Sequence, residues 1–164
     1  MNVLEHLEPK SVFRFFEEMC AIPHGSRNTK AVSDWCADFA RARGLEYHQD
    51  GDNNIIIIKE AAPGYEAAPP VILQGHLDMV CEQTADCQKD MSREGLDLAV
   101  DGDFVYAKGT TLGGDDGIAV AMALALLDAE GLPHPRLEAV FTVDEEIGLL
   151  GAASIDVTPL KGRQ

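Results

Sequence analysis

The first part of the chain carries apolar residues at helical spacing in two segments. In the segment 11–21, apolar side chains recur three or four positions apart, with Ser11 at the start and Pro23 beyond the end. Such spacing places apolar side chains on one face of a helix, and these two residues are typical of its N-cap and its stop. The segment 28–43 has the same pattern and is followed by Gly44, which suits the left-handed end of a helix. We therefore predict two amphipathic helices.

Short apolar runs separated by turn residues predict strands further along the chain. The four isoleucines at 55–58 follow an Asp-Gly-Asp-Asn turn, and their β-branched side chains favour a well-buried strand. The other strand candidates are LEYHQ at 45–49, VILQ at 71–74, LDLAV at 96–100, FVYAK at 104–108 and LEAVFTV at 137–143. The candidates at 96–100 and 104–108 flank an Asp-Gly-Asp turn, which predicts a hairpin.

A third helix is predicted over 118–131, where Gly131 would close it. Almost no polar residue interrupts the stretch 118–127, so we expect this helix to be buried on most sides. Strands that alternate with helices indicate an α/β fold, and we predict a mixed central sheet with helices on both faces. No repeat or linker divides the 164 residues, which is one domain's worth of chain.

Composition narrows the classes of partner. The formal charge of −15 disfavours nucleic acid and anionic membranes, since both require clustered Lys and Arg. No apolar run is long enough for a membrane span, and the N-terminus lacks the features of a signal peptide, so we expect a cytoplasmic protein. The four cysteines show no C-x-x-C spacing, which argues against a zinc ribbon or a redox motif and favours free thiols.

Three apolar elements share an unusual feature, because each places hard or imidazole ligands at a strand end or a helix start. His76 and Asp78 follow the strand candidate at 71–74. Asp115 lies in a glycine-rich turn before the third helix, and Glu145 with Glu146 follows the last strand candidate. Sites in open α/β sheets assemble at the carboxyl ends of strands, so we expect these five side chains to converge on one concave edge of the sheet.

Each of these signals alone has an ordinary explanation. A His-x-Asp pair is often only a satisfied polar pair, and adjacent glutamates usually form a solvated face. The glycine-rich loop could bind phosphate at a helix N-terminus, but Asp115 and Asp116 would repel an anion and favour a cation. The three signals together indicate a metal site, in which the Asp78 carboxylate could fix the tautomer of the His76 ring.

The segments that carry these residues resemble a known family. QGHLDMV at 74–80, KGTTLGGDDGIAVAMALALL at 108–127 and TVDEEIGLLGA at 142–152 are similar to the metal-site motifs of co-catalytic zinc peptidases of the aminoacylase and carboxypeptidase G2 type. LQGHLDMVCEQ and GTTLGGDDGIA most resemble the aminoacyl-histidine dipeptidases, also called Xaa-His or cytosol non-specific dipeptidases. The segments 13–45 and 52–61 also resemble this family, so the resemblance covers nearly the whole chain.

The resemblance implies a role for each candidate residue. His76 would bind one zinc ion, Asp115 would bridge two, and Glu146 would bind the second. Glu145 would act as general base and Asp78 would orient His76. It further implies a cis peptide bond between Asp115 and Asp116, two zinc ions (with cobalt or manganese as substitutes), dipeptide substrates such as Xaa-His peptides, and a homodimeric full-length enzyme.

In the family one further carboxylate and one histidine ligand follow the region that corresponds to this chain, together with a lid and dimerisation domain. We therefore expect residues 1–164 to be the N-terminal part of the catalytic domain, and to have little zinc affinity or activity alone. The alternatives are a related aminoacylase or tripeptidase with the same metal pair, or a non-catalytic metal-binding fragment.

Overall fold

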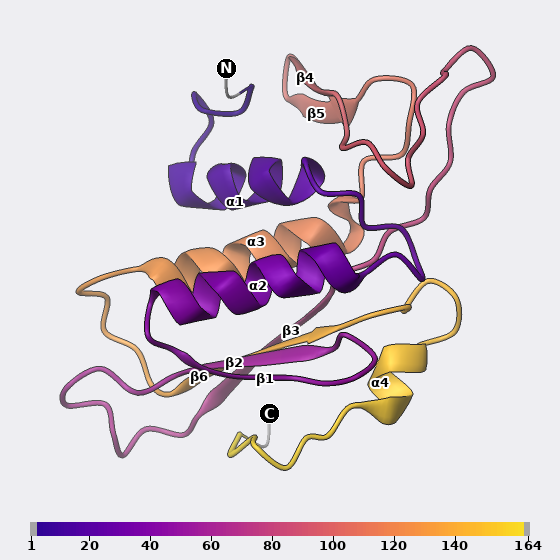
Figure 1. Cartoon of the computed structure of the whole chain (residues 1–164). Helices are drawn as coiled ribbons and strands as arrows, with labels where there is room; N and C mark the ends of the chain where they lie inside the picture. The colour runs from indigo at the N-terminus through magenta and orange to yellow at the C-terminus, as the bar shows by residue number, and fades with distance from the viewer. Residues whose placement is uncertain (1–2, 163–164) are drawn as a thin grey trace.

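The computed structural model describes residues 3–162, and its centre is a four-stranded mixed β-sheet (Figure 1). The strands lie in the order β1, β2, β6, β3, with bounds of Glu46–Gln49 for β1, Ile55–Lys59 for β2, Val71–His76 for β3 and Leu137–Thr142 for β6. β2 is antiparallel to β1 and to β6, whereas β3 and β6 are parallel. The isoleucines of β2 are at most 2% exposed, which confirms the predicted buried strand.

Three helices cover one face of the sheet in two layers (Figure 1). α2 (Lys30–Ala42) packs on β1 and β2, α3 (Gly114–Asp128) packs on β3 and β6, and α1 (Lys10–Cys20) lies on α3. The apolar faces predicted for α1 and α2 meet here, with the rings of Phe15 and Phe39 edge to face at a centroid distance of 5.4 Å. The main apolar core lies between these helices and the sheet.

The parallel strands and the helix between them form a β3–α3–β6 unit, which determines where a site can lie. Because β3 and β6 run in the same direction, their carboxyl ends meet at one edge of the sheet, and α3 begins at that same edge. Gly75 lets the start of α3 approach closely, since a Cβ there would lie 2.9 Å from Oδ2 of Asp116.

The start of α1 differs from the sequence prediction. Ser11 was predicted as the N-cap, but the helix begins at Lys10 and its N-cap is Pro9, and Oε2 of Glu8 accepts the backbone N–H of Lys10 at 3.0 Å. The φ angle of −75° at Pro9 already suits entry into a helix, and Glu8 supplies the side-chain acceptor that the serine was expected to provide. Gly44 after α2 has a φ of 64°, which confirms the left-handed position predicted there.

α3 also departs from the predicted boundaries and from the predicted burial. It begins four residues before Ile118 and ends at Asp128, so Gly131 lies in the following loop. Met122 and Leu126 are 54% and 38% exposed, because α3 packs on the sheet and on α1 but leaves another side open. Among residues 3–162, no helix has the length and apolar content needed to cross a bilayer.

A second, smaller layer covers the other face of the sheet. It consists of the short helix α4 (Leu150–Ser154) and the extended segment 155–162 (Figure 1). Its apolar contacts join three buried sheet residues to side chains of the segment, namely Ile56, Ile58 and Val140 to Ile155 and Leu160. Separately, β4 (Leu98–Asp101) and β5 (Phe104–Ala107) form the predicted hairpin around Asp101-Gly102-Asp103.

A buried ion pair fastens the segment 155–162 to the sheet. Glu138 of β6 is fully buried, accepts a 2.7 Å hydrogen bond from Nε of Arg136, and accepts backbone N–H groups of Lys161 and Gly162 at 2.8 and 2.9 Å. Burial alone would raise the pKa of Glu138, but the hydrogen bonds from Arg136, Gly162 and Lys161 outweigh burial and hold the pKa below its ordinary value of 4.5. A buried carboxylate with this many donors is ionised in the folded state.

We predict that Glu138→Gln lowers the free energy of unfolding by about 2–3 kcal/mol at pH 7, since it leaves Arg136 without its buried partner. Glu60→Gln is the matched control, because Glu60 also pairs with Arg136 but its side chain is 70% exposed, and we expect a loss below about 1 kcal/mol. Urea denaturation measures both losses.

The same pair predicts a pH dependence. A carboxylate whose pKa is lowered on folding stabilises the protein above its ordinary pKa of 4.5 and loses that contribution as the pH falls through the folded-state value. The stability difference between wild type and Glu138→Gln should therefore shrink below about pH 4. Equal losses for Glu138→Gln and Glu60→Gln, or a difference independent of pH, would contradict this account.

Candidate metal centre

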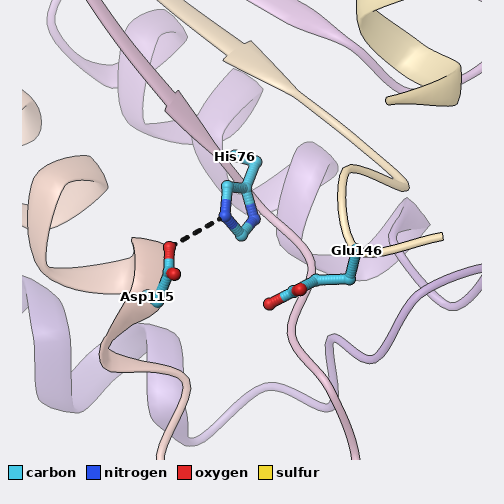
Figure 2. A group of neighbouring side chains, drawn as sticks. All are labelled: His76, Asp115 and Glu146. Carbon is cyan, nitrogen blue, oxygen red and sulfur yellow. Dashed lines mark hydrogen bonds and ion pairs between the residues drawn. The ribbon is translucent and has the colours of Figure 1, made fainter. Parts of the chain in front are cut away.

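The carboxyl ends of β3 and β6 and the start of α3 bring His76, Asp115 and Glu146 together (Figure 2). Nε2 of His76 lies 3.1 Å from Oδ1 of Asp115, and one ligand atom from each of the three residues lies within 4.8 Å of the others. Figure 2 shows the Asp115 and Glu146 carboxylates directed to the same space beside the imidazole ring. Asp78 and Glu145 lie at the same edge, so the structure brings together all five residues that the sequence pointed to.

The His76 ring is buried and held in one orientation. Its exposed fraction is 6%, and its Nδ1 lies 2.9 Å from the backbone carbonyl oxygen of Asp78. A carbonyl can only accept, so Nδ1 carries a proton, and Nε2 is the ring nitrogen that faces Asp115. The Asp78 carboxylate, which the sequence suggested for this role, is further away, with its Oδ1 at 3.5 Å from Nδ1.

The Asp78 carboxylate also binds the loop that carries the two glutamates. It is buried and accepts the backbone N–H of Glu145 at 3.0 Å and that of Glu146 at 3.4 Å. The hydroxyl of Ser26 donates to its Oδ2 at 2.7 Å. A buried carboxylate is costly unless such donors surround it, and here the donors come from two distant segments. Asp78 thus joins the end of β3 to the loop after β6.

Asp115 enters the site from a break in the helix. The backbone of Asp115 and Asp116 leaves helical φ/ψ values within the first turn of α3, and the Asp115–Asp116 peptide bond is cis, as predicted. The Asp115 side chain is 88% exposed, whereas the Asp116 carboxylate lies against Gly75 of β3. The two neighbouring carboxylates therefore face different surroundings, and Asp115 is the one available to a cation.

Glu145 and Glu146 lie in the turn that follows β6. Oε2 of Glu145 is 3.9 Å from Nε2 of His76, and its side chain is 34% exposed. Two hydrogen bonds to Val143 hold the start of this turn. The backbone N–H of Val143 donates to Oδ1 of Asn54, in the β1–β2 loop, at 3.1 Å, and the backbone N–H of Gly151 donates to the Val143 carbonyl at 2.9 Å. The glutamates thus project from a turn whose backbone is held on both sides.

The site is electrostatically suited to a cation. Burial disfavours the charged form of His76, but the hydrogen bonds to the Asp78 carbonyl and to Asp115, together with the charges of Asp78 and Asp116, raise its pKa above the ordinary value. Burial is the largest cause that raises the pKa of Asp116, and the charges of Asp115 and Glu145 raise it further, against the opposing effect of His76. Carboxylates crowded in this way stabilise positive charge among them.

Sequence reasoning missed the contribution of Ser26 and Asn54. Neither residue belongs to a recognisable ligand pattern, and their partners lie 52 and 89 positions away in the chain. The available signal for Ser26 was the irregular PHGS stretch between two predicted helices, which indicates a loop but not what the loop contacts.

Comparisons with known proteins show which family and which folds this chain is similar to. The sequence profile of peptidase family M20/M25/M40 matches residues 72–159, a range that contains all five candidate residues. The cytosol non-specific dipeptidase of Escherichia coli (strain K12) is 38% identical over 152 residues, which are 93% of this chain and 31% of that protein. The chain thus spans about a third of the length of this relative.

Solved structures show the same fold. The crystal structure of aminoacylhistidine dipeptidase from Vibrio alginolyticus superposes with a TM-score of 0.93 at 36% identity, covering 97% of this chain and 32% of that one. A tripeptidase from Staphylococcus aureus superposes with a TM-score of 0.74 at 22% identity, covering 93% of this chain and 41% of that one, and this likeness concerns the fold alone.

The close return of the chain at Gly151 predicts a strong effect of substitution there. A Cβ on Gly151 would collide with the carbonyl oxygen of Val143 and would lie 2.7 Å from its nitrogen, so Gly151→Ala must displace the turn that carries the glutamates. We expect a loss of about 3 kcal/mol in the free energy of unfolding. Gly51→Ala is the control, since no atom lies within 4 Å of a Cβ there. Thermal denaturation that shows equal stability for both variants would contradict the close packing.

Proposed function

The chain belongs to peptidase family M20/M25/M40, and on this premise we propose that residues 1–164 form the N-terminal part of the catalytic domain of a metal-dependent dipeptidase. The observation that carries the proposal is the approach of His76, Asp115 and Glu146 to within 4.8 Å, with Glu145 beside them. The Escherichia coli and Vibrio relatives, both named as dipeptidases, support the choice of reaction. This chain covers 31% and 32% of these two relatives, which supports the proposal that it is one part of a larger catalytic domain.

The residues at this edge fit zinc. An imidazole nitrogen and carboxylate oxygens are zinc ligands, and the Nδ1–H of His76 already donates to the Asp78 carbonyl, as zinc-bound histidines usually do through their second nitrogen. We propose that two zinc ions bind, with His76 on one, Glu146 on the other, and Asp115 between them. Cobalt or manganese could replace zinc with the same ligands. The exposed Asp115 carboxylate has two oxygens and could therefore serve as a ligand to both ions.

We propose that Glu145 is the general base. Two bound zinc ions would supply Lewis-acid activation of a water and of the scissile carbonyl. Glu145 is adjacent to Glu146 in the chain and its carboxylate reaches within 3.9 Å of the His76 ring, so it can accept a proton from a water at the site. The same carboxyl group can then donate that proton to the leaving amine, while Asp78 holds the backbone of both glutamates in place.

The substrates we propose are dipeptides of the Xaa-His type, by analogy with the aminoacylhistidine dipeptidase that the chain superposes on. We further propose that the whole protein is a homodimer and acts in the cytoplasm. The printed name of the Escherichia coli relative, a cytosol dipeptidase, supports the location.

Zinc binding to the whole protein tests the ligand set. We expect His76→Ala and Asp115→Asn each to weaken zinc affinity at least about tenfold in calorimetric titration, because each removes one protein ligand of a small set. His48→Ala is the matched control, since His48 also contacts a carboxylate, at 2.9 Å from Glu46, but lies on the exposed strand β1. Zinc affinity that falls only in the His48 variant would contradict the proposed site.

Turnover tests the role of Glu145. In the whole protein, Glu145→Gln should keep zinc binding and reduce kcat for a Xaa-His dipeptide by about 10²- to 10⁴-fold, the usual contribution of a general base. Glu46→Gln on β1 should leave kcat unchanged, because its side chain is 56% exposed and lies away from the site. Near-normal turnover by Glu145→Gln would assign the base to another group.

A further inference from the structure

The loop 24–27, between α1 and α2, lies against both chain segments that build the metal centre. On one side its backbone continues the sheet pairing beyond β3, since Met79 donates to the carbonyl of His24 at 3.1 Å and Ser26 donates to the carbonyl of Met79 at 3.3 Å. On the other side the backbone N–H of Arg27 donates to Oδ1 of Asp144 at 2.6 Å. The loop thus bridges the end of β3 and the turn after β6.

Arg27 and Asp144, the two residues of this bridge, both have an unusual backbone conformation. Their φ angles are 66° and 54°, in the left-handed region that non-glycine residues seldom occupy. The bridge between them places the turn that carries Glu145 directly beside the loop. The loop and the turn are more than a hundred residues apart in sequence, so this contact exists only in the folded protein.

The side chain of Ser26 reaches the Asp78 carboxylate beside the metal centre. Its hydroxyl donates to Oδ2 of Asp78 at 2.7 Å, and the two oxygens of the same carboxylate accept the N–H groups of Glu145 and Glu146. The Asp78 side chain is fully buried, so its orientation depends on the donors that surround it. Without the hydroxyl, Oδ2 keeps only the longer contact, to Glu146 at 3.4 Å.

We propose that Ser26 is a positioning residue for the metal centre. Its hydroxyl fixes the rotation of the Asp78 carboxylate, and the carboxylate in turn fixes the backbone from which the proposed base and the proposed ligand project. The consequence for metal binding rests on the function proposed above, whereas the positioning of the Glu145–Glu146 backbone does not.

Amide hydrogen exchange in the metal-free chain tests the positioning directly. We expect Ser26→Ala to accelerate exchange at the Glu145 amide about fivefold, the result of weakening one hydrogen bond to a charged acceptor, while amides of β2 keep their rates. Ser26→Thr retains the hydroxyl and should restore slow exchange. Ser33→Ala is the matched control, since Ser33 is also a hydrogen-bonded serine, buried on α2, but its hydroxyl contacts Gln49 at 2.8 Å.

Unchanged exchange at Glu145 in Ser26→Ala would overturn the proposal. The same is true of an equal acceleration in Ser33→Ala, because that result would show a general loosening rather than a specific link. Thermal denaturation of each variant identifies a temperature at which all of them are folded, and the exchange rates are compared at that temperature.

Zinc titration of the same variants separates this proposal from the function on which it depends. If zinc affinity of the wild-type chain depends on His76, Ser26→Ala should weaken it about threefold to tenfold, and Ser26→Thr should recover it. A wild-type affinity that does not depend on His76 would contradict the proposed metal site and leave the exchange result to decide the role of Ser26. A His76-dependent affinity that Ser26→Ala leaves unchanged would contradict the proposed role of Ser26 alone.

Discussion

The rest of the site depends on the hydrogen bonds that the buried Asp78 carboxylate accepts. The carboxylate is buried at the end of β3, where an ionised group is stable only if hydrogen bonds replace the water it has lost. The donors come from Ser26 in the loop before α2 and from Glu145 and Glu146 after β6. Satisfying this one carboxylate therefore requires that three segments, far apart in sequence, meet at the same edge of the sheet.

The β3–α3–β6 unit makes that meeting possible. Parallel strands joined by a helix place two carboxyl strand ends and one helix start at a single edge of the sheet. His76, Asp115 and Glu146, which lie at or just after these three ends, are therefore close together. The Asp78 backbone adds the last constraint. Its carbonyl accepts a hydrogen bond from Nδ1 of His76, and this bond orients the ring so that Nε2 faces Asp115. One residue thus orients the histidine through its carbonyl and the glutamates through its carboxylate.

Local sequence was sufficient to predict the strands, most helices and the five candidate residues, because each candidate interrupts an apolar element at its end. The isoleucines of β2 and the run before His76 are examples of patterns that need no tertiary information. The contacts that orient the site could not be predicted in this way. The Asp78 carboxylate lies 3.5 Å from Nδ1 of His76, as its position two residues away suggested, but its hydrogen bonds to the Glu145 amide, 67 residues away, and to Ser26 belong to no motif. Similarly, α3 begins four residues earlier than predicted, and Asp115 and Asp116 in its first turn have non-helical φ/ψ values that helical periodicity does not predict.

The central claim is that His76, Asp115 and Glu146 together hold metal at the carboxyl edge of β3 and β6. Anomalous diffraction at the zinc absorption edge, from crystals of this protein grown with zinc, tests it most directly. The account predicts an anomalous peak within bonding distance, about 2.0–2.2 Å, of Nε2 of His76 and of carboxylate oxygens of Asp115 or Glu146. Strong peaks only at surface groups such as His48 and Glu46, with none beside His76, would contradict it.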